Sequence, residues 1–174
     1  MIYFSSDLHF CHDRDFLYKP RGFNSIKEHD EQIIKNWNEI VTDEDEVYIL
    51  GDLMLNDNED GIRKLQQLKG KIHIICGNHD ENTRIELYKI LPNVVEVVYA
   101  LQLKIGKYYF FLCHYPVLVH NYDDNKKIWN IHGHTHSKNI FSENKHCYNV
   151  CLDAHNNKPI EINEIITDIQ KQNK

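Results

Sequence analysis

The sequence predicts a mixed α/β fold, in which strands form layered sheets and helices cover them. Short apolar runs of strand length alternate along the chain with longer amphipathic stretches of helical periodicity. The chain of 174 residues also has the size of one ordinary domain, and no internal repeat or linker divides it. We therefore expect a single domain over residues 1–174.

Several segments have the length and the apolar content of strands. They are Ile2–Ser5, Glu46–Leu50, Ile72–Cys76, Val94–Val98, Leu101–Ile105, Tyr108–Cys113, Ile128–His132 and Tyr148–Leu152. Only Gly106 and Lys107 separate two of these segments, which predicts a β-hairpin with glycine at the first turn position.

The predicted helices have apolar residues that recur on one face. The clearest covers about Ile26–Val41, where Ser25 and Glu28 have the spacing of a capping box. The others are expected at about Glu59–Lys69 with Gly70 as its stop, from Thr83 to before Pro92, and near the end of the chain around Ile162–Ile169.

Composition and charge narrow the classes of function. The formal net charge is -6, so the chain as a whole does not attract nucleic acid or an anionic membrane surface. The amino terminus has no basic region followed by a long apolar stretch, and no later segment is apolar enough to span a membrane. The five cysteines form no CxxC pair. We expect a reduced, cytoplasmic protein.

The polar residues with chemical potential follow directly after predicted strands. They lie in the clusters Ser6-Asp7-Leu8-His9, Gly51-Asp52, Gly77-Asn78-His79-Asp80, His114-Tyr115-Pro116 and Gly133-His134-Thr135-His136. Taken singly, such a cluster can be an ordinary turn or a loop with one hydrogen-bonded histidine. The carboxyl ends of strands in layered α/β folds converge on a shared crevice, however, so we expect the clusters to form one site.

The residue types in these clusters favour a metal centre. Carboxylates, imidazoles and an amide oxygen, without thiolates, suit Mn, Fe, Zn, Co or Ni. The pairs Asp7 with His9 and His134 with His136 are two residues apart, which places both side chains of a pair on one side of an extended segment. The candidate ligands are Asp7, His9, Asp52, Asn78, His114, His134 and His136. Two ions that share a carboxylate fit this set better than one tetrahedral ion, and phosphoryl transfer is a leading use of such pairs.

In their order along the chain, the motifs D-x-H, GD, GNHD, H and GHxH resemble those of the calcineurin-like metallophosphoesterases. The likeness extends over nearly the whole chain and is greatest to compact bacterial and phage members. The further matching segments are Phe10 with His12, Arg21-Gly22-Phe23, Asn36-Trp37-Asn38, Tyr48-Ile49-Leu50 and Asn149-Val150. Cys11 and Gly22 depart from the pattern, since the compact members have glycine and proline there.

The resemblance implies a four-layer αββα sandwich of two mixed β-sheets flanked by helices. It also implies two divalent metal ions, with manganese as the expected metal. The first ion would be held by Asp7, His9, Asp52 and His136. The second would be held by Asp52, Asn78, His114 and His134, so that Asp52 bridges.

The same resemblance gives other residues roles in catalysis and substrate binding. His79 would face the scissile phosphate and Asp80 would orient its imidazole, although capping of the next helix is an equal alternative for Asp80. His12 and Arg21 would contact the phosphate, with an exposed surface position as the alternative. The implied mechanism is attack by a hydroxide that bridges the two ions, while His79 protonates the leaving oxygen.

The predicted substrate is a small phosphate ester, with a nucleotide among the options, and a phosphodiester is favoured over a monoester. Monoesterases of this family commonly add arginines near the second motif, whereas the segment Asp52–Asp60 holds no arginine and four acidic residues. An acidic rim of this kind disfavours a dianion more than a monoanion. Arg21 is the residue that could restore binding of a dianion.

Other functions remain as alternatives. A protein phosphatase is disfavoured because the motif GDxxDRG is absent. A nuclease is indicated only by lysines around the histidine loop, which are Lys126, Lys127, Lys138 and Lys145. A non-catalytic interaction module is disfavoured because no candidate ligand is missing.

Overall fold

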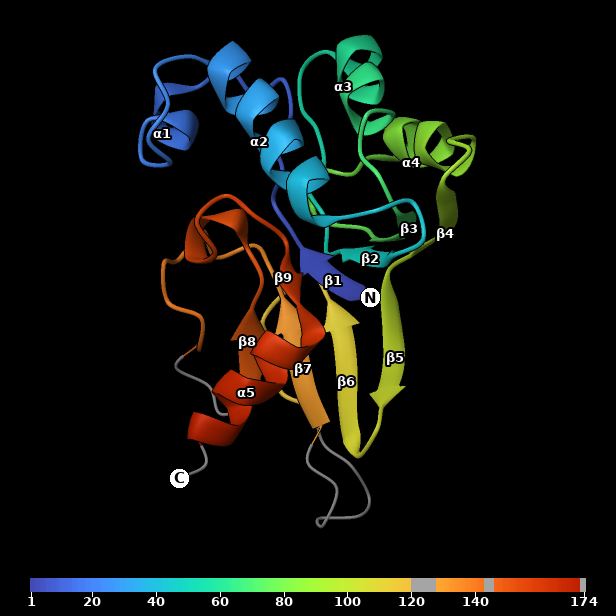
Figure 1. The fold of residues 1–174 in the computed structure, drawn as a ribbon. Helices are drawn as coiled ribbons and strands as arrows, with labels where there is room; N and C mark the ends of the chain where they lie inside the picture. The colour runs from blue at the N-terminus through green and yellow to red at the C-terminus, as the bar shows by residue number, and fades with distance from the viewer. Residues whose placement is uncertain (120–127, 143–145, 173–174) are drawn as a thin grey trace.

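The computed structural model describes residues 1–119, 128–142 and 146–172, which form two mixed β-sheets with flanking helices (Figure 1). The first sheet has five strands in the order β4-β3-β2-β1-β9, and the second has four in the order β5-β6-β7-β8. The predicted fold class is therefore confirmed. No helix of the described ranges combines the length and the apolar character that a membrane crossing requires.

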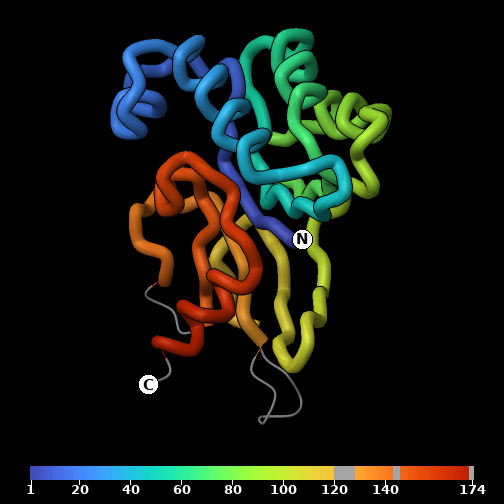
Figure 2. Tube along the Cα trace, in the orientation of Figure 1, coloured from blue at the N-terminus to red at the C-terminus, as the bar shows by residue number. Residues whose placement is uncertain are grey.

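The five-stranded sheet is parallel except at one edge. Its strands are β1 (Ile2–Ser5), β2 (Glu46–Ile49), β3 (Lys71–Ile75), β4 (Val94–Val98) and β9 (Ile160–Glu161). Strands β1 to β4 pair in parallel, and β9 pairs antiparallel to β1. In Figure 2 the late, red part of the chain accordingly returns to the blue first strand. The sequence gives no signal for β9, because two residues are too few to show an alternation.

The four-stranded sheet contains the predicted hairpin. Its strands are β5 (Ala100–Ile105), β6 (Tyr108–Cys113), β7 (Ile128–His132) and β8 (Cys147–Asn149). Strands β5 and β6 are antiparallel, and Gly106 in their turn has a φ of 56°, which glycine adopts without strain. Strands β6, β7 and β8 are parallel. Strand β8 ends before Leu152, because a 3-10 turn begins at that residue.

The helices largely follow the sequence pattern. They are α1 (Asp15–Tyr18), α2 (Ile26–Ile40), α3 (Asn58–Leu65), α4 (Asn82–Lys89) and α5 (Ile162–Gln172). Ser25 caps α2 as predicted, since its hydroxyl accepts the Glu28 N–H at 3.2 Å. The Glu28 carboxylate accepts the N–H of Asn24, one residue earlier than in a capping box.

Helix α3 ends at Leu65 and not at Lys69, because α2 binds the backbone groups that a longer helix would use. The Asn38 carboxamide donates to the carbonyl oxygen of Gln67 at 2.8 Å and accepts the N–H of Lys69 at 3.0 Å. The indole N–H of Trp37 donates to the carbonyl oxygen of Lys69 at 2.9 Å. Tertiary hydrogen bonds thus override the helical periodicity of this segment.

Both faces of the five-stranded sheet are buried. On one face, Val47 of β2 belongs to a cluster with Trp37 of α2 and the buried sides of α3 and α4. On the other face, Tyr48 belongs to a cluster with Phe110 of the second sheet and Ile165 of α5. Successive residues of β2 face opposite clusters because side chains alternate along a strand. Packing on both faces fixes the strand ends, which the candidate ligands follow in the sequence.

Candidate metal centre

The candidate ligands lie where strands of both sheets end. They follow β1, β2 and β3 of the five-stranded sheet and β6 and β7 of the four-stranded sheet. Backbone hydrogen bonds tie the loops together, since Asp7 donates its N–H to the carbonyl oxygen of Gly51 at 3.0 Å. Gly133 donates in the same way to His114 at 2.9 Å. The side chains brought together are Asp7, His9, Asp52, Asn78, His114, His134 and His136.

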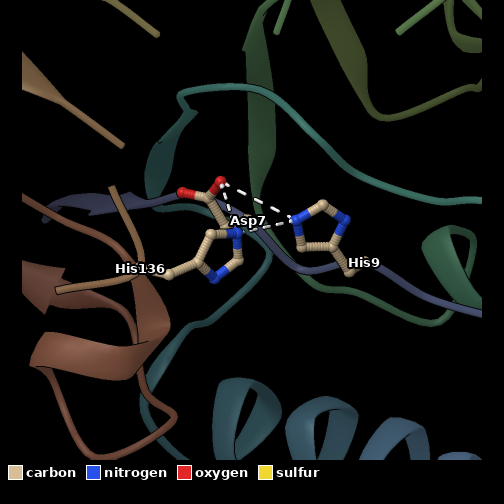
Figure 3. A group of neighbouring side chains, drawn as sticks. All are labelled: Asp7, His9 and His136. Atoms are coloured by element: carbon tan, nitrogen blue, oxygen red, sulfur yellow. Dashed lines mark hydrogen bonds and ion pairs between the residues drawn. The ribbon is translucent and has the colours of Figure 1, made fainter. Parts of the chain in front are cut away.

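One group of ligands comprises Asp7, His9 and His136 (Figure 3). The Nε2 atoms of His9 and His136 lie 3.1 Å apart. Oδ1 of Asp7 lies 3.8 Å from Nε2 of His9 and 3.6 Å from Nε2 of His136. Because the three side chains point toward one another, one cation between them can contact all three.

A second group comprises Asn78, His114 and His134. Nε2 of His114 lies 3.0 Å from Oδ1 of Asn78, and Nδ1 of His134 lies 2.9 Å from the same oxygen. The other ring nitrogen of His114, Nδ1, donates to the carbonyl oxygen of Leu50 at 2.7 Å. This hydrogen bond leaves the lone pair of Nε2 free for a cation.

Asp52 lies between the two groups. Its Oδ2 is 3.9 Å from Nε2 of His9 and 3.5 Å from Nε2 of His114. Its Oδ1 accepts the backbone N–H of His79 at 2.9 Å, which fixes the rotation of the carboxylate. One oxygen of Asp52 therefore faces both groups, as a bridging ligand must.

The carboxylates of Asp7 and Asp52 pair with no lysine or arginine side chain among the described residues. Oδ1 of Asp7 is buried and accepts no hydrogen bond from the part of the chain that the structure describes. Burial raises the pKa of Asp52, and the carboxylates of Asp7 and Asp80 add to this effect, although His114 opposes it. Burial lowers the pKa of His9, so its imidazole is neutral and can act as a ligand. Buried oxygens with unused lone pairs beside a neutral imidazole fit a divalent cation.

Many of the candidate ligands have left-handed backbone conformations, which L-residues rarely adopt. The φ angles are 57° at Asp7, 51° at His9, 57° at Asp52, 67° at His134 and 48° at His136. The expectation of extended segments at D-x-H and HxH is therefore wrong, because positive φ angles at Asp7, His9, His134 and His136 interrupt an extended backbone. Asp7 and His9 still converge, whereas His134 and His136 face different groups.

Comparison with known proteins gives the family. The calcineurin-like phosphoesterase superfamily domain matches residues 1–151. The chain belongs to this superfamily. It is thus a hydrolase of phosphate esters by family. The divalent metal ions that the family implies find candidate ligands in Asp7, His9 and His136, and in Asp7, Asp52 and His114, whose ligand atoms lie close together.

Relatives of similar length match most of this phosphoesterase. The uncharacterized protein MJ1445 of Methanocaldococcus jannaschii is 33% identical over 98% of this chain and 92% of its own. The Gene 66 protein of Mycobacterium phage L5 is 28% identical over 83% of this chain and 81% of its own. The crystal structure of AQ665 from Aquifex aeolicus, a protein of unknown function, has a TM-score of 0.71 at 25% identity and covers 96% of this chain and 98% of its own. The expected family resemblance is confirmed.

In this phosphoesterase a buried ion pair between Arg21 and Asp153 holds the candidate ligand His136 in place. Nδ1 of His136 lies 3.0 Å from Oδ2 of Asp153. The guanidinium of Arg21 donates to both oxygens of Asp153, at 3.1 and 2.7 Å. Burial opposes protonation of His136, but the hydrogen bond to Asp153 and the charge of Asp7 raise its pKa above the ordinary value. The ring is therefore oriented with Nε2 toward Asp7.

Arg21 is not the phosphate contact that the sequence suggested, nor an exposed residue. Its side chain is 1% exposed. Besides Asp153, it contacts the carbonyl oxygen of Asp7 at 2.9 Å and the ring of His29 at 3.0 Å. A guanidinium that lies beneath the candidate ligands, with four of its hydrogen bonds directed to Asp153, His29 and Asp7, is turned away from a substrate.

Asp80 neither orients His79 nor caps α4, so both predictions for it are wrong. Its carboxylate accepts hydrogen bonds from inside the fold. The donors are the N–H groups of Gly77, Asp52 and Leu53 and the hydroxyl of Tyr88, at 2.8 to 3.2 Å. The residue that precedes α4 is Glu81, whose side chain makes no capping bond. The buried N–H groups of two loops need an acceptor, and Asp80 supplies it.

His79 and His12 lie at the open side of the centre. The side chain of His79 is 43% exposed, and its Nε2 lies 4.0 Å from Oδ2 of Asp52. The ring of His12 lies 5.4 Å from that of His9, and both His12 and His79 border one cavity. Within the described ranges no side chain hydrogen-bonds the ring of His79. Its ring is therefore free to meet a substrate.

The sequence gives little indication of the residues that hydrogen-bond to the candidate ligands or to their neighbours, which are Asp153, His29 and Tyr88. Asp153 follows β8, so its position after a strand end was the available clue. His29 and Tyr88 lie within helices, where nothing distinguishes them from other buried residues. Of the lysines that indicate a nuclease, Lys138 is exposed, and Lys126, Lys127 and Lys145 lie outside the described residues.

Replacing Asp153 with Asn should weaken metal binding by about 10- to 100-fold, because the carboxylate that orients His136 loses its charge. The measurement is the dissociation constant of Mn²⁺ by isothermal titration calorimetry, on protein shown to be folded by circular dichroism. The matched control is Asp43→Asn, an exposed residue between α2 and β2, which should bind like the wild type. Unchanged affinity in folded Asp153→Asn would show that Asp153 does not position the ligand.

Proposed function

We propose that the chain is a dinuclear metal-dependent phosphoesterase that hydrolyses small phosphate esters and favours phosphodiesters. The position of Asp52 carries this proposal, since its Oδ2 faces both groups of ligands. The first ion would be held by Asp7, His9, Asp52 and His136, and the second by Asp52, Asn78, His114 and His134. Manganese is the metal that we expect, because oxygen and imidazole donors without thiolates suit it.

When bound, two such ions supply a nucleophile from water near neutral pH and offset the charge of the phosphate. Hydrogen bonds within the protein hold the residues that would bind these ions. Asp52 does not rotate, because its Oδ1 accepts the N–H of His79. His114 does not flip, because its Nδ1 donates to Leu50. Ligands fixed in advance need little reorganisation in the transition state, which favours catalysis.

His79 is the residue that we propose as the acid for the leaving oxygen. Its backbone N–H is bound to Asp52, so its ring stands beside the proposed bridging ligand. The ring also borders the cavity next to the centre, where an ester group has room. Because the side chain is partly exposed, solvent can return a proton to it after each turnover.

We propose the preference for diesters because the second negative charge of a monoester dianion would meet no lysine or arginine at the described cavity. Arg21 was the residue that could bind such a charge, and it is buried against Asp153. No lysine or arginine of the described chain borders the cavity beside the centre. The acidic segment Asp52–Asp60, which suggested a repelling rim, is partly neutralised by neighbouring cations. Glu59 pairs with Arg63, and Asp60 pairs with Lys64. The proposed preference for diesters therefore rests on the lack of a lysine or arginine side chain at the described cavity, and not on an acidic rim.

Two manganese ions should bind per chain after reconstitution, and Asp52→Ala should reduce the number because it removes the ligand that both ions share. Elemental analysis of the protein after gel filtration measures the stoichiometry. Asp43→Ala is the matched control and should keep both ions. One ion or fewer in the wild type, or an unchanged number in Asp52→Ala, would contradict the dinuclear site.

With manganese bound, kcat/KM should be about 10-fold or more higher for bis(p-nitrophenyl) phosphate than for p-nitrophenyl phosphate, because the dianion lacks a partner. The two substrates release the same chromophore, so the ratio compares charge at a constant leaving group. A ratio clearly below one would show that the substrate class is a monoester.

His79→Ala should lose about 100-fold or more in turnover of diesters with poor leaving groups, because these need a proton on the departing oxygen. With p-nitrophenol as the leaving group the loss should shrink, since this phenolate departs without a proton. Elemental analysis should find both manganese ions in the variant. An equal loss for good and poor leaving groups would remove His79 from the acid role.

A further inference from the structure

A cavity of about 560 Å³ opens directly beside the metal centre. Two of the candidate ligands, His9 and His136, form its inner side. The segment around α1 forms its outer wall with Phe16, Leu17 and Pro20. This volume lies within the range of about 300–1,000 Å³ that small-molecule sites occupy. The cavity is thus large enough for an ester group of a substrate bound at the metal centre.

Phe16 is an exposed aromatic ring on an anchored segment. The residue is 72% exposed, whereas its neighbours Leu17 and Tyr18 are buried, at 5% and 7%. Leu17 and Tyr18 anchor α1 to the protein. The backbone of Phe16 is therefore fixed at the cavity, although its ring is exposed to solvent. The ring lies nearly perpendicular to the His12 ring, at a centroid distance of 5.6 Å and an interplanar angle of 86°. An exposed ring beside a reaction centre has apolar area available to a ligand.

The chemistry of the cavity favours an uncharged, planar group. Among the residues that the structure describes, no lysine or arginine borders it. The carboxylate that borders it, Asp153, already accepts from Arg21 and pairs with His136. A charged group would therefore find no partner outside the metal centre. An aromatic group, by contrast, packs well on the rings of Phe16 and His12.

We propose that this cavity binds the leaving group of the substrate and that this group carries an aromatic ring, either a simple aryl group or the base of a nucleoside. The inference rests on the proposed function. In the reaction the oxygen of water bonds to phosphorus, and the bond from phosphorus to the leaving oxygen breaks with its electron pair. His79 gives that oxygen a proton, and the proton of the attacking water passes to solvent. Because His79 borders the cavity, the alcohol departs beside Phe16.

Benzyl methyl phosphate tests the proposal within one molecule, because either of two alcohols of similar acidity can leave. The manganese-loaded protein should release benzyl alcohol about 10-fold faster than methanol, as measured by proton NMR. Phe16→Ala should bring the product ratio close to one, and Phe16→Trp should preserve the preference. A ratio near one in the wild type, or an unchanged ratio in Phe16→Ala, overturns the proposal.

The matched control is Ile90→Ala. Ile90 is 75% exposed and follows α4, on the side of the helical layer opposite α1 (Figure 1). Both truncations remove an exposed apolar side chain, so neither disturbs the core. The product ratio of Ile90→Ala should equal that of the wild type. A shift as large as that of Phe16→Ala would show that the ratio does not report on the cavity and would overturn the assignment.

Binding without turnover separates failure of this inference from failure of the proposed function. Phenylphosphonate should bind the manganese-loaded protein about 10-fold more tightly than methylphosphonate, by isothermal titration calorimetry. Phe16→Ala should remove the difference. If no alcohol is released from the diester but the phenyl preference is found, the proposed function fails and the cavity assignment stands. Equal affinities overturn the cavity assignment whatever the activity.

Thymidine 5′-methylphosphate distinguishes the two kinds of aromatic group in the same assay. Where benzyl alcohol is preferred, release of thymidine in preference to methanol, lost in Phe16→Ala, shows that a nucleoside also serves as the leaving group. Preference for benzyl alcohol without preference for thymidine supports it with a simple aryl group. Methanol as the favoured product from both substrates overturns it.

Discussion

One buried carboxylate holds the loops after β2 and β3 together, and the spacing of the candidate ligands depends on it. Asp80 accepts the backbone N–H groups of Gly77, Asp52 and Leu53. Without it, these buried donors would be unpaired, at about 1–3 kcal/mol each. The loops approach so closely that a Cβ atom on Gly77 would lie 2.3 Å from Oδ1 of Asp52. Asp80 thus sets the position of Asp52, and Asp52 sets the distance between the two groups of ligands.

Backbone strain is concentrated at the same place. Residues with left-handed φ angles include Asp7, His9, Asp52, His134 and His136. This conformation costs about 1–2 kcal/mol for a residue with a Cβ atom, and it persists only where the surroundings impose it. Here the strands are buried on both faces, and the N–H of Asp7 is bound to Gly51 across the loops. Candidate ligands that are already held in this conformation would not have to rearrange around a cation, so the stability of the core maintains the geometry of the site.

The sequence predicts which residues gather but not how the supporting residues are used. The strands beside the site were predictable, because each is an apolar run followed at once by a polar cluster. The roles of Arg21 and Asp80 were not, because a sequence shows donors and acceptors without the burial that decides which of them must pair. The partner of Arg21, Asp153, is 132 residues away. Helix α1 has four residues, too few for a periodic pattern, so the wall that Phe16 forms had no signal either.

The burial of Arg21 also bears on the charge that the proposed site can accept. Because Arg21 pairs with Asp153, the carboxylates left to the two proposed ions are Asp7 and Asp52. Two divalent cations would exceed these carboxylates by two positive charges. A hydroxide and a monoanionic diester would together neutralise that excess, whereas a dianionic monoester would leave one negative charge unpaired where screening by water is weak. On the proposed function, this one buried ion pair orients the candidate ligand His136 and also keeps Arg21 from the substrate, which would place a dianion at a disadvantage.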